Sequence, residues 1–224
     1  MRNNKLIGTG VALVTPFHDD YTIDFDSLER LIEYLIANHI DYFVVLGTTG
    51  ESATLSNKEQ DEVLDFVRKK VNSRIPIVVG VGGNDTHKVI NRINEINLTG
   101  VEAVLSVCPY YNKPSQKGLL KHYSMIAEIC PVDIILYNVP SRTALNIGVD
   151  TVCNLAARYN NIIGIKEASG DMTQCMSLIK SVPSDFLIIS GDDKMTFLMM
   201  AAGGVGVISV QAMAFPKEFS NMVA

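Results

Sequence analysis

The sequence predicts a (β/α)₈ barrel, and three observations lead to this fold class. Eight short apolar runs rich in β-forming residues recur along the 224 residues, and segments of helical period separate them. Hydrophobic residues make up 47% of the chain and charged residues only 19%, as expected where strands are buried on both faces. We therefore expect one barrel domain over residues 1–224, with strands at Val11–Phe17, Tyr42–Leu46, Ile75–Val81, Val101–Cys108, Asp133–Asn138, Ile162–Lys166, Phe186–Ser190 and Val205–Val210.

The segments between these runs carry apolar residues at helical spacing. Ser56 and Glu59 form a capping box, which predicts a helix starting just after Ser56. Repeats of three and four residues indicate amphipathic helices packed on a sheet. The apolar positions that define them are Leu28, Leu31, Ile32, Leu35 and Ile36, then Val63, Leu64, Phe66 and Val67, then Val89, Ile93 and Ile96, then Leu119, Tyr123 and Ile126.

Strands that alternate with helices imply parallel strands joined by right-handed crossovers. A doubly wound open sheet is the alternative, but Thr15-Pro16-Phe17 stands where a glycine-rich nucleotide loop would follow its first strand. Pro216 is expected to begin the eighth helix, and the sequence reaches Ala224 a few residues later. The eighth helix is thus expected to be incomplete, so that the chain is a fragment or another chain covers this part of the wall.

The composition narrows the classes of partner and cofactor. The net charge is −5, the pI is about 5.4 and the longest run of Lys and Arg is three residues, at 68–70, so we expect no nucleic acid and no membrane partner. The cysteines and histidines are scattered without the spacing of a metal site, and we expect neither a metal nor an organic cofactor. These residues are Cys108, Cys130, Cys153 and Cys175, with His18, His39, His87 and His122.

The long uncharged stretch Met195–Pro216 is the one segment that resembles a membrane span. Its glycines at 203, 204 and 206 and the polar Ser209 and Gln211 favour a helix end, a turn and a buried strand instead. Residues 1–10 contain no apolar core of a signal peptide. We therefore expect a soluble, cytoplasmic protein.

Lys166 is the strongest candidate for a catalytic residue. It ends the apolar run that begins at Ile162, and a lysine kept from water attacks carbonyl groups to form a Schiff base. Taken alone, the segment fits a structural lysine that reaches solvent at a strand end even better. The other strand ends decide between the two interpretations, because reactive groups gather at the carboxyl ends of barrel strands.

Four of those strand ends carry further groups of interest. Thr48 and Thr49, between glycines, form an anion cradle or an ordinary capped turn. Tyr137 can donate and accept a proton, and Arg142 can bind a carboxylate through two hydrogen bonds. The tyrosine pair at 110–111 packs within its loop, or places a phenol over the pocket or across a subunit contact. One of the two aspartates at 192–193 is expected to cap the following helix.

Five motifs then resemble the dihydrodipicolinate synthase (4-hydroxy-tetrahydrodipicolinate synthase) family. This family belongs to the pyruvate-dependent class I aldolases, which include N-acetylneuraminate lyase. The similarity runs from about Gly8 to Val210, one motif per strand end and in order. The motifs are GTTGE at 47–51, PYYNKP at 109–114, YNVPSRT at 137–143, GIKEASGD at 164–171 and SGDD at 190–193.

The resemblance implies a lyase that condenses pyruvate with L-aspartate 4-semialdehyde in lysine and diaminopimelate biosynthesis. Lys166 would form the Schiff base, and Tyr137, Thr48 and Tyr111 would relay protons. A neighbouring subunit would contribute Tyr111 within a homodimer or homotetramer. The resemblance further assigns the pyruvate carboxylate to Thr48 and Thr49, the semialdehyde carboxylate to Arg142, and the lining of the pocket to main-chain groups of Gly191 and Ile208. The family's C-terminal helical bundle is absent from these 224 residues.

The resemblance also implies an allosteric cleft for lysine at the dimer contact. Four positions match it, namely Ser52, Ala53, Asn84 and Tyr110. Asn57, Gln60 and Lys88 stand where inhibited family members commonly have histidines and a glutamate. The cationic Lys88 would repel the ammonium group of lysine. We therefore expect weak or absent feedback by lysine.

Two other functions remain open from the sequence. The chain is alternatively an aldolase for another aldehyde, such as a 2-keto-3-deoxy sugar acid, although the Ser-Arg-Thr triplet ending at Thr143 favours a short carboxylated substrate. A further alternative is a barrel that binds keto acids or protein partners but catalyses no reaction. The full set of reactive residues favours an enzyme.

Overall fold

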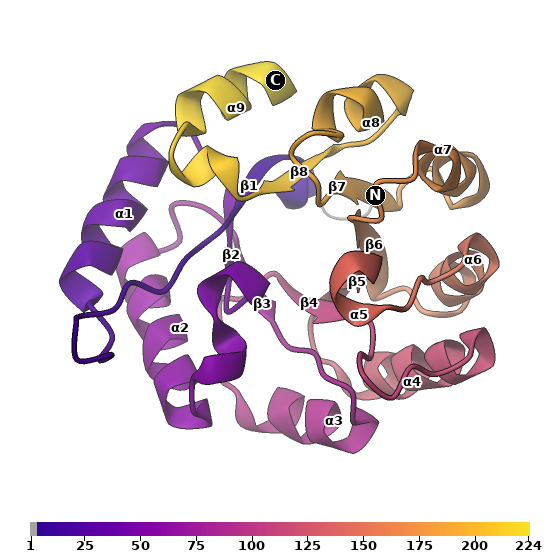
Figure 1. Cartoon of the computed structure of the whole chain (residues 1–224), viewed down its shortest axis with the longest axis horizontal. Coiled ribbons are helices and arrows are strands. Elements are labelled where there is room, and N and C mark those ends of the chain that lie inside the picture. Colours follow the sequence, from indigo (N-terminus) through magenta and orange to yellow (C-terminus); the bar gives the residue numbers. More distant parts are fainter. Residues whose placement is uncertain (1–3) are drawn as a thin grey trace.

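The computed structural model describes residues 4–224 as a closed barrel of parallel strands in sequence order, surrounded by helices (Figure 1). The last strand pairs with the first, with Gly8 opposite Gly206, which closes the ring. This confirms the predicted (β/α)₈ fold. The strands are β1 Gly8–Ala12, β2 Tyr42–Val45, β3 Ile77–Gly80, β4 Ala103–Val107, β5 Asp133–Asn138, β6 Ile162–Glu167, β7 Leu187–Ser190 and β8 Gly206–Ser209.

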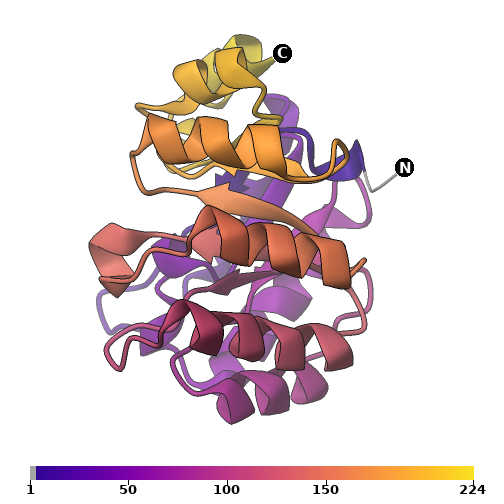
Figure 2. The same ribbon diagram turned by 90° about the vertical axis from the view of Figure 1, so that its right-hand side faces the viewer.

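The α-helices run along the outside of the barrel, and several lie side by side when it is seen from the side (Figure 2). They are α1 Phe25–Ala37, α2 Asn57–Val71, α3 Thr86–Glu95, α4 Gln116–Ile129, α5 Pro140–Thr143, α6 Val149–Arg158, α7 Met172–Ser181, α8 Thr196–Ala202 and α9 Pro216–Val223. Short 3₁₀ turns are η1 Asn4–Leu6, η2 Thr48–Gly50, η3 Ser52–Thr54 and η4 Gln211–Met213. The predicted capping box of Ser56 and Glu59 begins α2.

The first strand was predicted in the wrong place. It occupies Gly8–Ala12, whereas the prediction was Val11–Phe17. A Cβ at Gly206 would lie 2.1 Å from the carbonyl oxygen of Gly8, so β1 and β8 approach closely through glycines that carry no hydrophobic signal. Pro16 lacks an N–H and cannot continue a strand ladder, which explains why the later part of the apolar run is a loop.

Two apolar layers hold the barrel together. The outer layer packs strand residues such as Leu136 and Ile165 against helix residues such as Leu119. The inner layer fills the barrel with strand side chains, among them the fully buried Tyr42 and the nearly buried Tyr137. Side chains alternate between these layers along each strand, which determines whether a residue points into the barrel or toward the helices.

Strand β6 breaks this alternation by one residue. Ile134 of β5 pairs with Ile162, but the next residue, Ile135, pairs with Gly164, so Ile163 is an extra residue in β6. Ile162 and Ile165 belong to the outer layer and Ile163 to the inner one. A β-bulge of this kind changes the direction of the side chains that follow it.

The uncharged stretch at 195–216 folds as expected. It holds the whole of α8, a left-handed Gly203 that ends this helix, the buried strand β8 and the turn η4. Among residues 4–224, none of the helices has both the length and the apolar character that crossing a membrane requires.

Candidate active site

Lys166 lies inside the barrel near the carboxyl end of β6. It is 5% exposed, and its Nζ lies 4.5 Å from the centroid of the Tyr137 ring. Burial lowers the pKa of this amine from 10.5 to about 8; the carboxylate of Asp193 opposes the shift and Arg142 adds to it. A neutral, nucleophilic amine is therefore populated near neutral pH, as Schiff-base formation requires.

Tyr137 is held beside this amine by the register of the sheet. It is the residue of β5 that pairs with Lys166, and its ring belongs to the inner layer. Burial raises the pKa of Tyr137, while a hydrogen bond with the Thr48 side chain and the charge of Arg142 oppose the rise. The phenol therefore lies among groups from β5, η2 and α5 and can exchange protons with a ligand bound to the amine.

Gly191 leaves the space in which the lysine side chain lies. A Cβ at this position would come within 2.9 Å of the Lys166 Cγ and Cε atoms. Any larger residue would displace the amine or move the strand end. Ile208 of β8 is buried in the same inner layer as Tyr137. The two positions that the resemblance assigned to the pocket lining thus lie on β8 and directly after β7.

Neither Asp192 nor Asp193 caps the next helix, so that expectation was wrong. Helix α8 begins after Met195 without a side-chain cap. One Asp193 carboxylate oxygen instead accepts hydrogen bonds from the backbone N–H groups of Val210 at 3.2 Å and Gln211 at 3.0 Å. Its other oxygen, Oδ1, is buried and accepts no hydrogen bond from the described residues 4–224. The carboxylate joins the ends of β7 and β8 and places a negative charge near Lys166.

The predicted anion cradle forms the 3₁₀ turn η2 after β2. Gly47 precedes the turn, and Glu51 follows it in the left-handed conformation with φ of 53°. The Gly50 N–H donates to the Gly47 carbonyl at 3.0 Å, so the turn itself uses this amide. The Thr48 side chain is exposed and Thr49 is half-buried. The Gly50 amide is therefore engaged within the turn, which leaves the threonine hydroxyls as the candidate donors for an anion.

A cavity of about 540 Å³ is lined by part of the candidate active site and by the candidate allosteric cleft; its lining residues do not include Lys166, Thr49, Gly191 or Ile208. Its walls include Thr48, Tyr137 and Arg142 on one side. Helix α5, which carries Arg142, lies beside the opening of the strand ring and not in the outer circle of helices (Figure 1). All five residues predicted for the cleft also line this cavity: Ser52, Ala53, Asn84, Lys88 and Tyr110.

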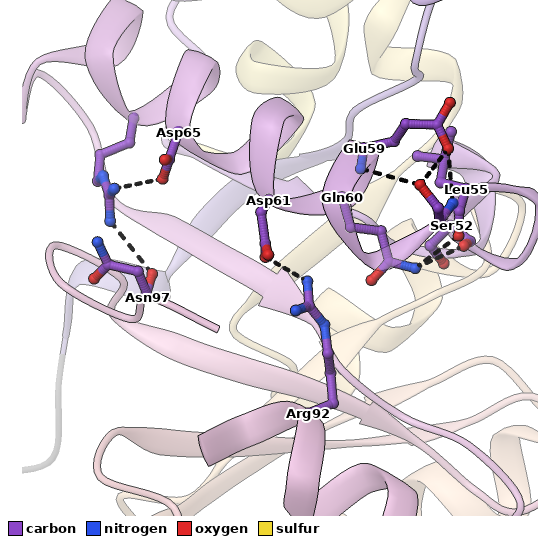
Figure 3. Close-up of polar contacts among 10 residues, drawn as sticks. Ser52, Leu55, Glu59, Gln60, Asp61, Asp65, Arg92 and Asn97 are labelled. Atoms are coloured by element: carbon purple, nitrogen blue, oxygen red, sulfur yellow. Dashed lines mark hydrogen bonds and ion pairs between the residues drawn. The ribbon is translucent and has the colours of Figure 1, made fainter. Parts of the chain in front are cut away.

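Sequence analysis missed Arg92 in the wall of the cleft. Its side chain points toward Asp61 of α2 in Figure 3, and its guanidinium donates to that carboxylate at 2.6 Å. Its Nε is buried and has no hydrogen-bond partner within residues 4–224. Gln60 also lines the cavity, and its amide donates to the carbonyls of Ser52 at 3.0 Å and Leu55 at 3.3 Å. The helical period of α3 indicated only its buried face and not this contact with α2.

Tyr111 is the one predicted catalytic residue that the chain does not bring to the others. Its side chain is 90% exposed, its φ is 66°, and it does not line the cavity. The preceding residue, Tyr110, does line it. Within the loop at 109–114, Tyr110 therefore lies at the cavity while Tyr111 extends into solvent.

A buried lysine beside a tyrosine, at the carboxyl ends of adjacent strands of a closed barrel, is the arrangement of an enzyme that works through a Schiff base. The chain belongs to the dihydrodipicolinate synthetase family, whose model matches residues 5–224.

Similar proteins cover nearly all of the chain. The 4-hydroxy-tetrahydrodipicolinate synthase of Flavobacterium psychrophilum is 52% identical over 217 residues, which are 97% of this chain and 74% of that protein. The crystal structure of dihydrodipicolinate synthase from Aquifex aeolicus has a TM-score of 0.94 at 39% identity, over 97% of this chain and 74% of the other. The lysine-bound enzyme of Cyanidioschyzon merolae has a TM-score of 0.94 at 35% identity, over 99% and 75%.

Proposed function

We propose that this chain is a lyase that condenses pyruvate with L-aspartate 4-semialdehyde, giving 4-hydroxy-tetrahydrodipicolinate for lysine and diaminopimelate biosynthesis. One observation carries the proposal. The buried Lys166 lies over Tyr137 in a chain that matches the synthase family from residue 5 to residue 224. Relatives named for this reaction share about half of the residues of the chain.

The first half of the reaction uses Lys166 as nucleophile. Its neutral amine adds to the C2 carbonyl of pyruvate, and loss of water leaves a protonated imine. The phenol of Tyr137 is placed to donate the proton that the departing oxygen needs. The positive imine then withdraws electrons from the neighbouring methyl group, which loses a proton to give an enamine.

The second half forms the new carbon–carbon bond. The enamine attacks the aldehyde carbon, and the aldehyde oxygen takes a proton. The amino group of the former semialdehyde then attacks the imine carbon, closes the ring and releases Lys166 as a free amine. The Thr48 side chain lies near Tyr137 and lowers the pKa of the phenol, so the two side chains are suited to relay the protons of these steps.

The polar groups at the carboxyl ends of the strands match the two carboxylates of the substrates. We assign the pyruvate carboxylate to Thr48 and Thr49, and the carboxylate of the semialdehyde to Arg142 at the opening of the barrel. A guanidinium binds a carboxylate through two parallel hydrogen bonds, which fixes the orientation as well as the position of the aldehyde. Main-chain groups of Gly191 and Ile208 complete the pocket.

We further propose that Tyr111 enters the active site of a second copy in a homodimer or homotetramer. Its exposed side chain supports this assignment. The cleft at the same end of the barrel holds the cationic Lys88 and Arg92, which supports weak or absent inhibition by lysine. We place the enzyme in the cytoplasm.

Reduction with borohydride in the presence of pyruvate tests the mechanism. We expect a pyruvyl adduct on the peptide that contains Lys166, found by mass analysis of a digest. An adduct on another lysine, or none, would overturn the proposed chemistry. Turnover of pyruvate with aspartate semialdehyde, compared with sugar aldehydes, then tests the substrate. A preference for sugar aldehydes would identify a sugar-acid aldolase instead.

A further inference from the structure

The carboxylate of Glu167 lies on the opposite face of β6 from the reactive amine. It is 2% exposed and follows Lys166 directly in the strand. Three groups donate hydrogen bonds to it: the Asn138 amide at 2.9 Å, the Ser169 N–H at 2.6 Å and the Gln174 amide at 2.9 Å. Among residues 4–224 the ion pairs include none to this carboxylate. Glu167 thus accepts hydrogen bonds from neutral donors on both oxygens.

The same donors hold the loop that follows Arg142. The Asn138 amide donates to Asn146 at 2.7 Å, and its oxygen accepts from the N–H of Ile147 at 3.2 Å. Gln174 and Asn146 exchange two hydrogen bonds, of 2.7 and 3.1 Å. The loop after α5 is therefore connected to Glu167 through two amide side chains, one on β5 and one on α7.

This network is tied to β5 and β6, which carry the reactive pair, and to the loop that follows helix α5, which carries Arg142. Asn138 and Glu167 are register partners, as are Tyr137 and Lys166 one residue earlier. A hydrogen bond between the first pair therefore helps to fix the spacing of the second pair. The loop held by Asn146 likewise helps to fix the end of α5.

We propose that Glu167 is a positioning residue of the reaction. Its buried carboxylate keeps the Tyr137 phenol and the Lys166 amine in register, and through Gln174 and Asn146 it holds the loop that follows helix α5, which carries Arg142. The inference rests on the proposed function, in which these three groups act on the two substrates. Misplacement of a reacting group by about 1 Å costs on the order of a hundredfold in rate, so such a support has kinetic consequences.

Glu167→Gln is the sharpest variant because it keeps the shape of the side chain. Both carboxylate oxygens accept from N–H donors, so the new NH₂ group faces another donor, the amide of Asn138 among them, whichever way it turns. We expect kcat/KM for the semialdehyde to fall by about tenfold or more, and pyruvate trapping by borohydride to slow as well.

A double substitution tests the hydrogen bond between positions 167 and 174 rather than Glu167 alone. In the double variant E167Q/Q174E the carboxylate moves to position 174 and accepts a hydrogen bond from the new amide at position 167. We expect the double variant to recover part of the rate that Glu167→Gln loses, and a further loss would contradict the pairing of these two side chains.

A third substitution removes only the hydrogen bonds between this network and the loop that follows helix α5. Asn146→Ala affects an exposed residue that bonds Gln174 and Asn138. It should raise KM for the semialdehyde and leave pyruvate trapping unchanged, because the amine and the phenol keep their register.

Asn161→Ala is the matched control for general destabilisation. Asn161 precedes β6 at the amino end of the barrel, and its amide donates to the carbonyls of Ala127 and Cys130. Its removal should lower the melting temperature and leave the kinetic constants unchanged. The inference fails if Glu167→Gln stays within about twofold of the wild-type constants, or if Asn161→Ala slows the reaction as much.

The wild-type chain separates this inference from the proposed function. If it traps pyruvate but does not turn over the semialdehyde, the proposed substrate is wrong. The trapping rate of Glu167→Gln then still decides the positioning role, because trapping depends only on the amine and the phenol. If the Glu167→Gln chain is insoluble, Asn146→Ala tests the inference instead. An unchanged KM for the semialdehyde in Asn146→Ala would then overturn the proposed link to Arg142.

Discussion

The Nζ of Lys166 lies 4.5 Å from the centre of the Tyr137 ring, and the two residues are register partners on β6 and β5. Register partners cannot separate without breaking the hydrogen bonds of the sheet. The spacing of amine and phenol is therefore a property of the barrel and not of a mobile loop. The predictions below test what each neighbour contributes to this pair.

Replacement of the amine should abolish the reaction. Lys166→Ala removes the nucleophile, and we expect a loss of turnover on the order of 10³-fold or more, together with loss of the borohydride-trapped adduct. Lys180→Ala, which removes an exposed lysine of α7, is the control and should keep both. Condensation at an undiminished rate by the Lys166→Ala chain would contradict the proposed mechanism.

Lys166 should also reduce the stability of the fold below alkaline pH. Its pKa is about 8 in the folded chain and 10.5 when unperturbed. Between these values the unfolded chain binds a proton that the folded chain does not, so stability rises with pH across this window. Lys166→Met should therefore be more stable than the wild type at pH 7, by up to roughly 3 kcal/mol, and the difference should shrink as pH rises from 8 to 10.5. Urea unfolding at several pH values measures it; a constant difference would contradict the burial argument.

Asp193 should set the pH at which the amine becomes reactive. Its negative charge favours the protonated amine, so Asp193→Asn should lower the pKa of Lys166 further. We expect the pH profile of pyruvate trapping to move toward lower pH. Asp192→Asn is the control, because Asp192 binds the Lys194 N–H and is not among the charges that shift Lys166. Equal shifts in both variants would show that Asp193 has no specific role.

Lysine should inhibit this chain weakly, and the charge at position 88 should control the effect. Lys88 lines the cleft and is exposed. Lys88→Glu replaces repulsion of the ligand's ammonium by attraction, which we expect to strengthen inhibition by roughly fivefold to tenfold, or about 1 kcal/mol. Inhibition curves at low ionic strength measure this. Strong inhibition of the wild type at submillimolar lysine would refute the prediction.

Tyr111 should act across a subunit contact. Tyr111→Phe and Lys166→Ala are each expected to be inactive or nearly so. A mixed dimer would contain one complete site, with Lys166 from one copy and Tyr111 from the other. After unfolding and refolding together in equal amounts, we expect about a quarter of the wild-type activity. A mixture no more active than its components would place Tyr111 outside the partner's site.

The sequence supports the fold and the centre of the site for one physical reason. Apolar runs alternate with helical periods, and each reactive residue stands at the end of a run, where the barrel gathers side chains. Lys166, Tyr137 and Thr48 were found in this way. Their catalytic roles remain predictions, since they come from the resemblance and from the geometry.

The features that the sequence did not indicate depend on contacts between distant segments. Strand β1 was misplaced because its glycines fit closely against β8 and carry no hydrophobic signal. The partners of Asp193 lie 17 and 18 residues further along the chain. Arg92 reaches Asp61 on the neighbouring helix, 31 residues away. Local periodicity contains no information about such pairs.

The extra residue at Ile163 decides which side of the sheet is chemically active. If the same residues formed a regular strand with Ile162 facing the helices, strict alternation would point Lys166 toward the helices as well. Glu167 would then point into the barrel interior. The irregularity at the start of β6 thus selects a nucleophile over an acid at the same depth. The same sequence in a regular strand would therefore give a barrel whose interior holds no lysine amine at this position to react with a keto acid.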